Sequence, residues 1–181
     1  MGHERNDGHN SKLQVLIQPN IGLDQDVRHS VVGLLNLVLA DEAVLAAKTR
    51  CAYWNIRGAD FFTLYSLCKS QYRLLNNVSG ELAERVRMLG GFAVGSMGEF
   101  LRLSRLEEQN GDAPTALHLL ADHETAIRCL REDARKCSEE YEDEGTFDLL
   151  VSILRLHEKM AWMLRSHVEV ESVSGKRPAA L

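Results

Sequence analysis

The sequence predicts an all-α fold in which four long helices pack as a bundle. Its 181 residues include only three prolines, at positions 19, 114 and 178, and proline is excluded from helix interiors. Apolar residues recur mostly three, four or seven positions apart, which is the period of one helical face. We find no segment with the apolar–polar alternation of a β-strand. These three observations favour long helices separated by short breaks.

A first long helix is expected over residues 24–54. Asp24 suits the N-cap, and the carboxylate of Asp26 suits the positive end of the helix dipole. The apolar face consists of Val27, Val31, Leu34, Leu35, Val38, Val44 and Leu45. The sequence Ile-Arg-Gly at 56–58 ends this helix.

A second long helix is expected over residues 60–89, again with an acidic residue, Asp60, at its start. Its apolar stripe suits the core of a bundle and consists of Phe61, Leu64, Leu67, Leu74, Leu75, Val78, Leu82 and Val86. The glycine pair at 90–91 stops the helix, because glycine favours the position just after a helix end.

The remainder of the chain predicts one short helix and two more long ones. The short helix covers residues 96–104 and lies between loops. Pro114 fits the first position of a third long helix that runs to about residue 141. An acidic turn at 142–145 then leads into a fourth long helix over residues 146–168.

The expected organisation is a polar N-terminal tail at 1–22, a bundle at 23–168 and a C-terminal tail at 169–181. The connection between the second and third long helices is long enough for the single crossover of ferritin-like folds. Periodicity alone leaves cytokine-like, cytochrome-like and ferritin-like bundles open.

Composition narrows the partners and the compartment. The formal net charge is −5, and neither terminal segment forms a basic arm, so binding to DNA is not favoured. The N-terminal residues lack the apolar core of a signal peptide, and no run of about 18 apolar residues suggests a membrane span. We therefore expect a cytoplasmic protein with no membrane partner. The four cysteines show no metal or disulfide spacing and are expected to be buried, reduced thiols.

Six short motifs, in order along the chain, resemble those of the Dps family of mini-ferritins. The longest is YWNIRGADFFTL at 53–64, which resembles the family's His-Trp-Asn turn and the Phe-rich start of its second helix. The others are LAER at 82–85 with LGG at 89–91, EFL at 99–101, LADH at 120–123, DEGT at 143–146 and HEKMAW at 157–162.

This resemblance implies a ferritin-like four-helix bundle with a short helix in the crossover between helices two and three. Members of the family assemble twelve copies into a hollow shell, so a homo-oligomer, a dodecamer, is expected. They bind ferrous iron between two-fold-related subunits, oxidise it with peroxide and store the mineral inside the shell. Many also bind DNA through basic tails.

The resemblance also implies that the ferroxidase site is degenerate in this chain. The family's two histidine positions are occupied by Tyr53 and Tyr65, and its aspartate position by Gly80. Only Glu84 matches a family ligand. Lys69, one helical turn after Tyr65, lies where the family often has an acidic residue.

These substitutions remove good iron ligands. Imidazole and carboxylate offer lone pairs at neutral pH, whereas a phenol has a pKa near 10 and binds poorly until it is deprotonated. The ammonium of Lys69 could pair with Glu84 and replace the cation. We therefore predict no iron at the usual centre and no ferroxidase activity. The alternative is a modified site of Tyr53, Tyr65 and Glu84 that favours ferric iron.

Other candidate ligands are weaker. The chain lacks the Glu-x-x-His motif of di-iron bundle proteins. His118 and Asp122 share a helix face, but such a pair is more typical of surface groups or ion pairs. His157 and His167 have no acidic partner at the helical spacing of a metal site.

The acidic turn predicts a cation entrance. In the family, the ends of the third and fourth helices line three-fold pores, and Glu142, Asp143, Glu144 and Asp148 occupy that region here. Three copies of these carboxylates would focus a negative potential on the pore. The alternative is a solvated turn with carboxylates at a helix N-terminus.

The sequence thus predicts a Dps-like dodecameric cage for iron sequestration or stress protection, with iron as a mineral or at a weak site. Co-assembly with an active relative is a further expectation. The alternatives are a ferroxidase with a modified Tyr/Glu site and a DNA-associated structural cage.

Overall fold

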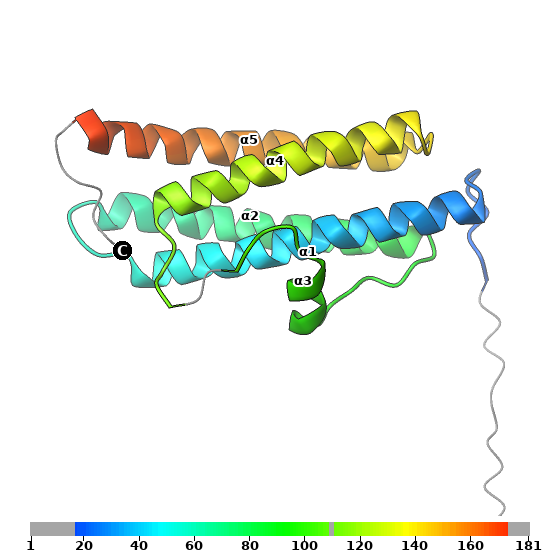
Figure 1. The fold of residues 1–181 in the computed structure, drawn as a ribbon, viewed down its shortest axis with the longest axis horizontal. Helices are drawn as coiled ribbons and strands as arrows, with labels where there is room; N and C mark the ends of the chain where they lie inside the picture. The colour runs from blue at the N-terminus through cyan, green and yellow to red at the C-terminus, as the bar shows by residue number, and fades with distance from the viewer. Residues whose placement is uncertain (1–16, 109–110, 174–181) are drawn as a thin grey trace, which may run out of the picture.

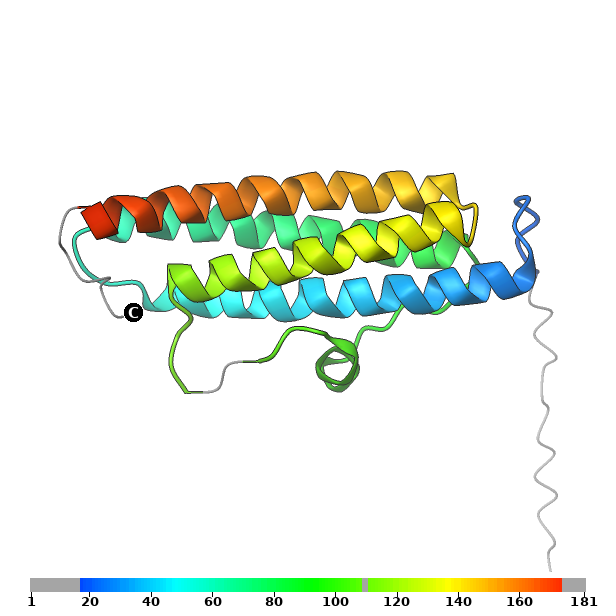
Figure 2. The same ribbon diagram turned by 45° about the horizontal axis from the view of Figure 1, so that its top comes forward.

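The computed structural model describes residues 17–108 and 111–173, and it confirms the predicted all-α bundle with a short helix between the second and third long helices. The helices are α1 (Gln25–Asn55), α2 (Phe61–Met88), α3 (Met97–Leu103), α4 (Ala116–Glu139) and α5 (Glu144–Val173). Helices α1 and α2 form one antiparallel hairpin, α4 and α5 form a second, and the two hairpins pack on each other (Figures 1 and 2).

The connection from α2 to α4 runs along the whole bundle, because α2 ends at one end and α4 begins at the other (Figure 1). Helix α3 lies within this connection and packs against α1. Its first turn is closed by a capping box in which Ser96 Oγ accepts from the N–H of Glu99, whose carboxylate accepts from the N–H of Ser96. The crossover is therefore an ordered element rather than a loose loop.

Arg105 fastens the crossover to two helices of the bundle. Its guanidinium donates to Asp41 of α1 and to Asp133 of α4, each at 2.8 Å. Burial would lower the pKa of Arg105, but the two carboxylates outweigh this effect and raise it. The pairing keeps the arginine charged and joins three segments that are distant in sequence.

The start of α4 differs from the prediction. Pro114 was expected at the first helical position, but α4 begins at Ala116 after Thr115 as N-cap. Thr115 Oγ1 accepts from the N–H of His118, and His118 Nδ1 accepts from the N–H of Thr115. This reciprocal cap contributes about 1 kcal/mol and decides the boundary.

Helix α5 is longer than predicted at both ends. It begins at Glu144 rather than at 146, because Asp143 caps it by accepting from the N–H of Thr146 at 3.0 Å. It continues to Val173, so residues 169–173 of the expected C-terminal tail are helical. Of the expected N-terminal tail at 1–22, residues 1–16 lie outside the described residues, and residues 17–22 precede α1.

The core consists of two apolar clusters, one toward each end of the bundle. One contains Leu39 of α1, Leu130 of α4 and Leu154 of α5. The other cluster lies toward the opposite end of the bundle on the same helices, and its residues include Val44, Leu119, Leu120 and Met160. On each of the three helices, one polar residue falls between the residues of the two apolar clusters. These residues are Glu42, His123 and His157, each at most 1% exposed, and together they form a polar layer.

Helix α1 is long and apolar enough to cross a membrane by length and composition, although no run of that kind was expected. Of its most apolar 18-residue window, 61% is buried inside the bundle. This burial accounts for the composition, because a core helix of a bundle needs apolar residues on most of its surface.

Candidate functional site

The expected ferroxidase positions on α1 and the start of α2 form an aromatic cluster. The ring centroids of Tyr53 and Tyr65 are 5.8 Å apart in an edge-to-face arrangement, and Tyr72 lies 5.7 Å from Tyr53. Phe61 stacks on Tyr65 at 5.4 Å. The two phenols therefore pack on other rings, which is how aromatic pairs gain stability beyond area burial.

Lys69 lies one turn further along α2 and points at Tyr65, as predicted from its spacing. Its Nζ donates to the Tyr65 hydroxyl at 2.9 Å and lies 5.0 Å from the ring centroid. Both residues are partly buried. An ammonium group thus lies against one of the two positions that the family uses for a metal-binding imidazole.

Gly80 and Glu84 lie far from this cluster in the same chain. Tyr65 and Glu84 are 19 positions apart on α2, which is about 28 Å along the helix axis at 1.5 Å per residue. Glu84 and Gly80 are both exposed. The two halves of the expected site can meet only if a second copy brings its own α2 alongside.

Among residues 17–108 and 111–173, no group of three or more His, Cys, Asp and Glu side chains is arranged to hold a metal ion. The expected ferroxidase centre is a different arrangement, because it needs residues from two subunits. The loss of that centre therefore stays a prediction.

Of the four expected pore residues, Asp143 has a structural role within the chain. It is 3% exposed, and its carboxylate accepts from Thr146 Oγ1 at 2.6 Å and pairs with Arg85 Nη2 at 2.7 Å. Arg85 also donates to Thr146 Oγ1 at 2.9 Å. The cap of α5 is thereby tied to α2.

The other three acidic residues of this turn remain available. Glu142, Glu144 and Asp148 are all exposed at the start of α5. Glu142 has a positive φ of 49°, an uncommon conformation for a residue other than glycine. The turn and the start of α5 thus present three exposed carboxylates, and the fourth, Asp143, is paired with Arg85.

A buried chain of polar residues was missed by the sequence analysis. His157 Nε2 lies 2.7 Å from Glu42 Oε1, and His157 Nδ1 lies 3.0 Å from His123 Nδ1. The sequence predicts no acidic partner for His157, because helical spacing relates only residues of the same helix. Its partner comes instead from α1, 115 positions away.

Only one signal in the sequence pointed toward this chain of residues. His123 and His157 end and begin two of the motifs quoted above, LADH and HEKMAW, and each falls at an apolar-face position of its helix. Glu42 interrupts the apolar run of α1 in the same way. A search for polar residues on apolar faces would have found all three.

The pair of His118 and Asp122 has separate partners. His118 belongs to the cap of α4, and Asp122 Oδ2 lies 2.6 Å from Lys48 Nζ. Burial raises the pKa of Asp122, and the neighbouring Lys48 opposes this shift. The expectation of an ion pair or surface group is met for Asp122.

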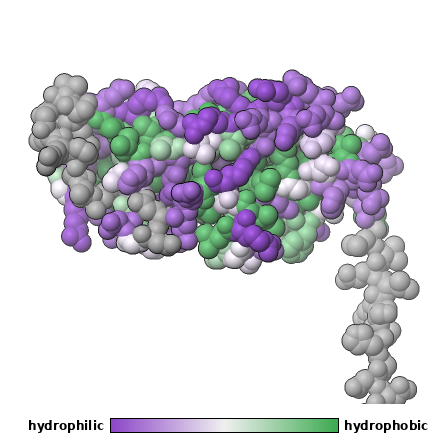
Figure 3. Space-filling view, in the orientation of Figure 1, coloured by the Kyte–Doolittle hydropathy of each residue, from purple (hydrophilic) through white to green (hydrophobic). Residues whose placement is uncertain are grey.

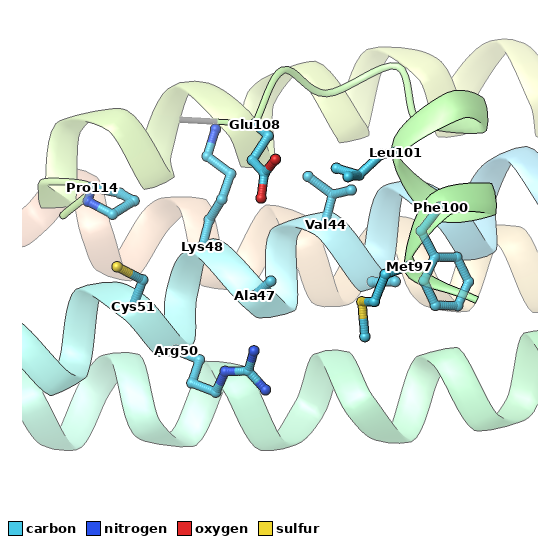
Figure 4. Close-up of a pocket in the computed structure, with 11 residues that line it drawn as sticks. Val44, Ala47, Lys48, Arg50, Cys51, Met97, Phe100, Leu101, Glu108 and Pro114 are labelled. Carbon is cyan, nitrogen blue, oxygen red and sulfur yellow. The ribbon is translucent and has the colours of Figure 1, made fainter. Parts of the chain in front are cut away.

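A groove of about 340 Å³ is lined by α1, α3 and the crossover (Figure 4). Met97, Phe100 and Leu101 of α3 form one wall, and Val44 and Cys51 of α1 lie on the other. Its walls are mainly apolar. In the view of Figure 3, hydrophobic residues gather below the hydrophilic upper edge, where α4 and α5 lie.

Comparison with protein families and relatives agrees with the fold. A family model described as a ferritin-like domain matches residues 32–172. A low temperature-induced protein of Nostoc sp. is 41% identical over 166 residues, with 88% of this chain and 93% of that protein covered. The DNA protection during starvation protein 2 of Bacillus anthracis is 32% identical over 139 residues, with 75% and 94% covered.

Two solved structures resemble this one closely. DpsC from Streptomyces coelicolor has 32% identity and a TM-score of 0.79, with 84% of this chain and 91% of that chain covered. The Dps protein of Vibrio cholerae O1, described as a member of the ferritin-like diiron-carboxylate proteins, has 28% identity and a TM-score of 0.78. In that comparison 83% of this chain and 96% of the other are covered.

Proposed function

Because the chain belongs to the Dps family of ferritin-like proteins, we propose that it forms an iron-sequestering, stress-protective cage with a degenerate ferroxidase centre. The observation that carries this proposal is the contact between Lys69 and Tyr65 at 2.9 Å. A cation-binding site does not hold a fixed ammonium, because like charges repel at short distance. The subunit would contribute to the shell without oxidising iron at the two-fold interface.

The proposed shell is a homododecamer in the cytoplasm. Several large apolar side chains of the described chain are exposed, including Trp54 at 66%, Phe62 at 81%, Phe92 at 74% and Met97 at 71%. We assign these side chains to contacts with other subunits of the shell, because large apolar groups gain stability when they are buried. Glu84 and Gly80 would then face Tyr53 and Tyr65 of a neighbouring copy.

Iron would reach the interior through acidic pores. Glu142, Glu144 and Asp148 are exposed, and three copies around a symmetry axis would concentrate negative potential there. Neutralising Asp148 and Glu144 together should slow iron loading without unfolding the shell. Unchanged loading would assign these residues to solvation of the turn instead.

The ferroxidase proposal is tested by anaerobic titration with ferrous iron followed by peroxide. We expect no fast, stoichiometric oxidation by the wild type. The matching variant restores ligands through Tyr53→His, Tyr65→His, Lys69→Asp and Gly80→Asp, and it should gain a fast phase that saturates with iron. A Cβ at Gly80 meets nothing within 4 Å in the chain, so an aspartate fits there.

Controls separate ligand restoration from the mere addition of polar residues. Tyr72→His adds an imidazole to the same aromatic cluster, and Gly98→Asp adds a carboxylate where a Cβ also meets nothing within 4 Å. Neither control should create the fast phase. Fast stoichiometric oxidation by the wild type would overturn the proposal.

A modified ferric site is the second candidate, and the 5.8 Å approach of the Tyr53 and Tyr65 rings favours it. Ferric iron bound to a phenolate gives a visible charge-transfer band. A band that disappears in Tyr65→Phe would support this candidate, and its absence from the wild type would reject it.

Binding to DNA and co-assembly complete the proposal. With a net charge of −5 per chain, we expect no retardation of DNA in a low-salt gel shift. Co-assembly with an active relative would place a complete half-site opposite this chain, and mixed refolding followed by native mass spectrometry would detect such particles.

A further inference from the structure

Three titratable side chains in the middle of the bundle form a continuous hydrogen-bonded chain, which we name the Glu42–His157–His123 cluster. Glu42 comes from α1, His123 from α4 and His157 from α5. Their exposed fractions are 1%, 0% and 0%. The cluster has no part in the proposed iron site, which lies on α2 and the end of α1.

The directions of the hydrogen bonds can be followed from atom to atom. Of the two Nδ1 atoms that lie 3.0 Å apart, one carries the hydrogen and the other accepts it. The other nitrogen of His157 faces Glu42 Oε1 at 2.7 Å. At the two ends of the chain, Glu42 Oε2 and His123 Nε2 are buried and have no hydrogen-bond partner.

Burial restricts the number of protons that the cluster can hold. A lone carboxylate or imidazolium in an apolar interior costs several kcal/mol, so a buried group of this kind stays close to neutral overall. One proton shared between Glu42 and His157 gives a neutral cluster with His123 uncharged. A second proton would leave a net positive charge.

In the part of the chain that the structure describes, the carboxylates next to the cluster on α1 and α4 are already paired and do not compensate that second charge. On α1 and α4, Asp41 and Asp133 both pair with Arg105 of the crossover. Asp122 of α4 pairs with Lys48 of α1. Each of these carboxylates already has a cationic partner of its own.

Among the described residues of α2 and α5, the buried groups near this level are uncharged and the acidic group is paired. Helix α2 contributes the buried, uncharged Gln71, which donates to the carbonyl of Met160 at 3.1 Å, and the thiol of Cys68. On α5, Glu158 pairs with Arg131 at the exposed surface. Burial, and then the neighbouring His157, lower the pKa of His123 well below its ordinary value of 6.5.

We propose that the Glu42–His157–His123 cluster is an acid-sensitive lock of the bundle, which holds one proton in the folded state and releases the packed helices when a second proton is taken up. The physical basis is the location of the cluster between the two apolar clusters of the core. A charge there would separate side chains that otherwise pack across the centre. The lock would make the subunit, and any shell built from it, loosen in acid.

The sign of the pH dependence follows from the proton counts. In the unfolded chain both histidines are exposed, and below about pH 6.5 each of them carries a proton. An exposed glutamate such as Glu42 in that state stays ionised down to about pH 4.3. The folded cluster holds one proton, so unfolding takes up one more. The folding equilibrium constant should therefore fall about tenfold for each pH unit below about 6.5.

Neighbouring carboxyls cannot produce this loss. Burial raises the pKa of both Asp122 and Asp133, although their basic partners oppose the shift. A carboxyl with a raised pKa binds protons more readily when folded. These two groups therefore stabilise the folded state as the pH falls, which is the opposite sign.

The test is the pH dependence of urea unfolding of the full chain between pH 5 and 8, at one protomer concentration. In His123→Gln the amide oxygen can still accept from the Nδ1–H of His157, but the amide does not titrate. Its folding equilibrium constant should therefore be almost independent of pH, where that of the wild type falls about tenfold per pH unit. In Glu42→Gln the folded cluster no longer holds the shared proton, so unfolding takes up two protons. Its folding equilibrium constant should therefore fall about a hundredfold per pH unit.

His29→Gln is the matched control, because His29 is an exposed imidazole on the same helix as Glu42. It should leave the pH dependence unchanged. Proton uptake on unfolding at pH 5.5, measured by calorimetry in two buffers, should drop by one in His123→Gln. This measurement decides the matter even where Glu42→Gln does not fold.

Equal pH dependence in the wild type and His123→Gln would overturn the proposal, as would equal proton uptake in these two proteins. A shallower dependence in Glu42→Gln would also overturn it.

Discussion

Replacing Asp143 with alanine should destabilise the subunit strongly, although the residue lies in a surface turn. The substitution removes the N-cap of α5, which is worth about 1 kcal/mol. It also leaves Arg85 without its carboxylate, and breaking a buried pair costs about 3 kcal/mol. Because Arg85 is 20% exposed and keeps Thr146 as a partner, we expect a total near 3 kcal/mol.

The assay is urea unfolding followed by circular dichroism at pH 7.5. Protomer concentration must be the same for every variant, since assembly stabilises the folded state by mass action. Asp148→Ala is the control, because this carboxylate is exposed in the same part of α5 and should change the stability by less than about 0.5 kcal/mol. A double-mutant cycle of Asp143→Ala with Arg85→Met isolates the pair, and the coupling should exceed about 1 kcal/mol.

A loss below about 1 kcal/mol for Asp143→Ala would refute the structural role assigned to this residue. Additive effects in the cycle would refute the ion pair. Either result would return Asp143 to the group of exposed carboxylates around the expected pore. Iron loading of the same variants would then be the measurement of interest.

Two further predictions concern the crossover and the cysteines. Arg105→Met should destabilise the protein by about 3 kcal/mol in urea unfolding, because Asp41 and Asp133 lose their shared cation in a largely buried place; a change below about 1 kcal/mol would contradict this. Burial raises the pKa of Cys68 and, with Asp143 nearby, that of Cys137 to about 12, so fewer than about one in ten thousand of these thiols ionises at pH 7.5. A thiol reagent should thus modify at most the two half-buried cysteines of the native protein, whereas modification of all four without unfolding would be inconsistent with the structure.

Helix positions were predictable because they depend on local spacing. The apolar period and the glycine pair at 90–91 located the ends of α1 and α2 to within one residue. The starts of α4 and α5 were less accurate, since they depend on which polar side chain caps the first turn. Thr115 and Asp143 take that role through hydrogen bonds that composition does not reveal.

The candidate site was likewise predictable from the sequence only in part. The motif at 53–64 was sufficient to place Tyr53 and Tyr65 at the family's histidine positions, and the helical period predicted that Lys69 would point toward Tyr65. The distance between this cluster and Glu84 also follows from helix geometry alone. Whether the two halves of the site meet depends on how two subunits pack, which local sequence patterns do not encode.

By itself, the sequence determined the class of fold, the order of its helices and the family, because each depends on periodicity or on motifs of neighbouring residues. Only the tertiary structure decided that Glu42, His123 and His157 form one buried cluster, and that Arg105 joins α1 to α4. These contacts connect residues up to 115 positions apart, and no local pattern encodes which buried polar groups will meet. The packing of the two hairpins brings them together, and burial then requires each polar group to find a partner.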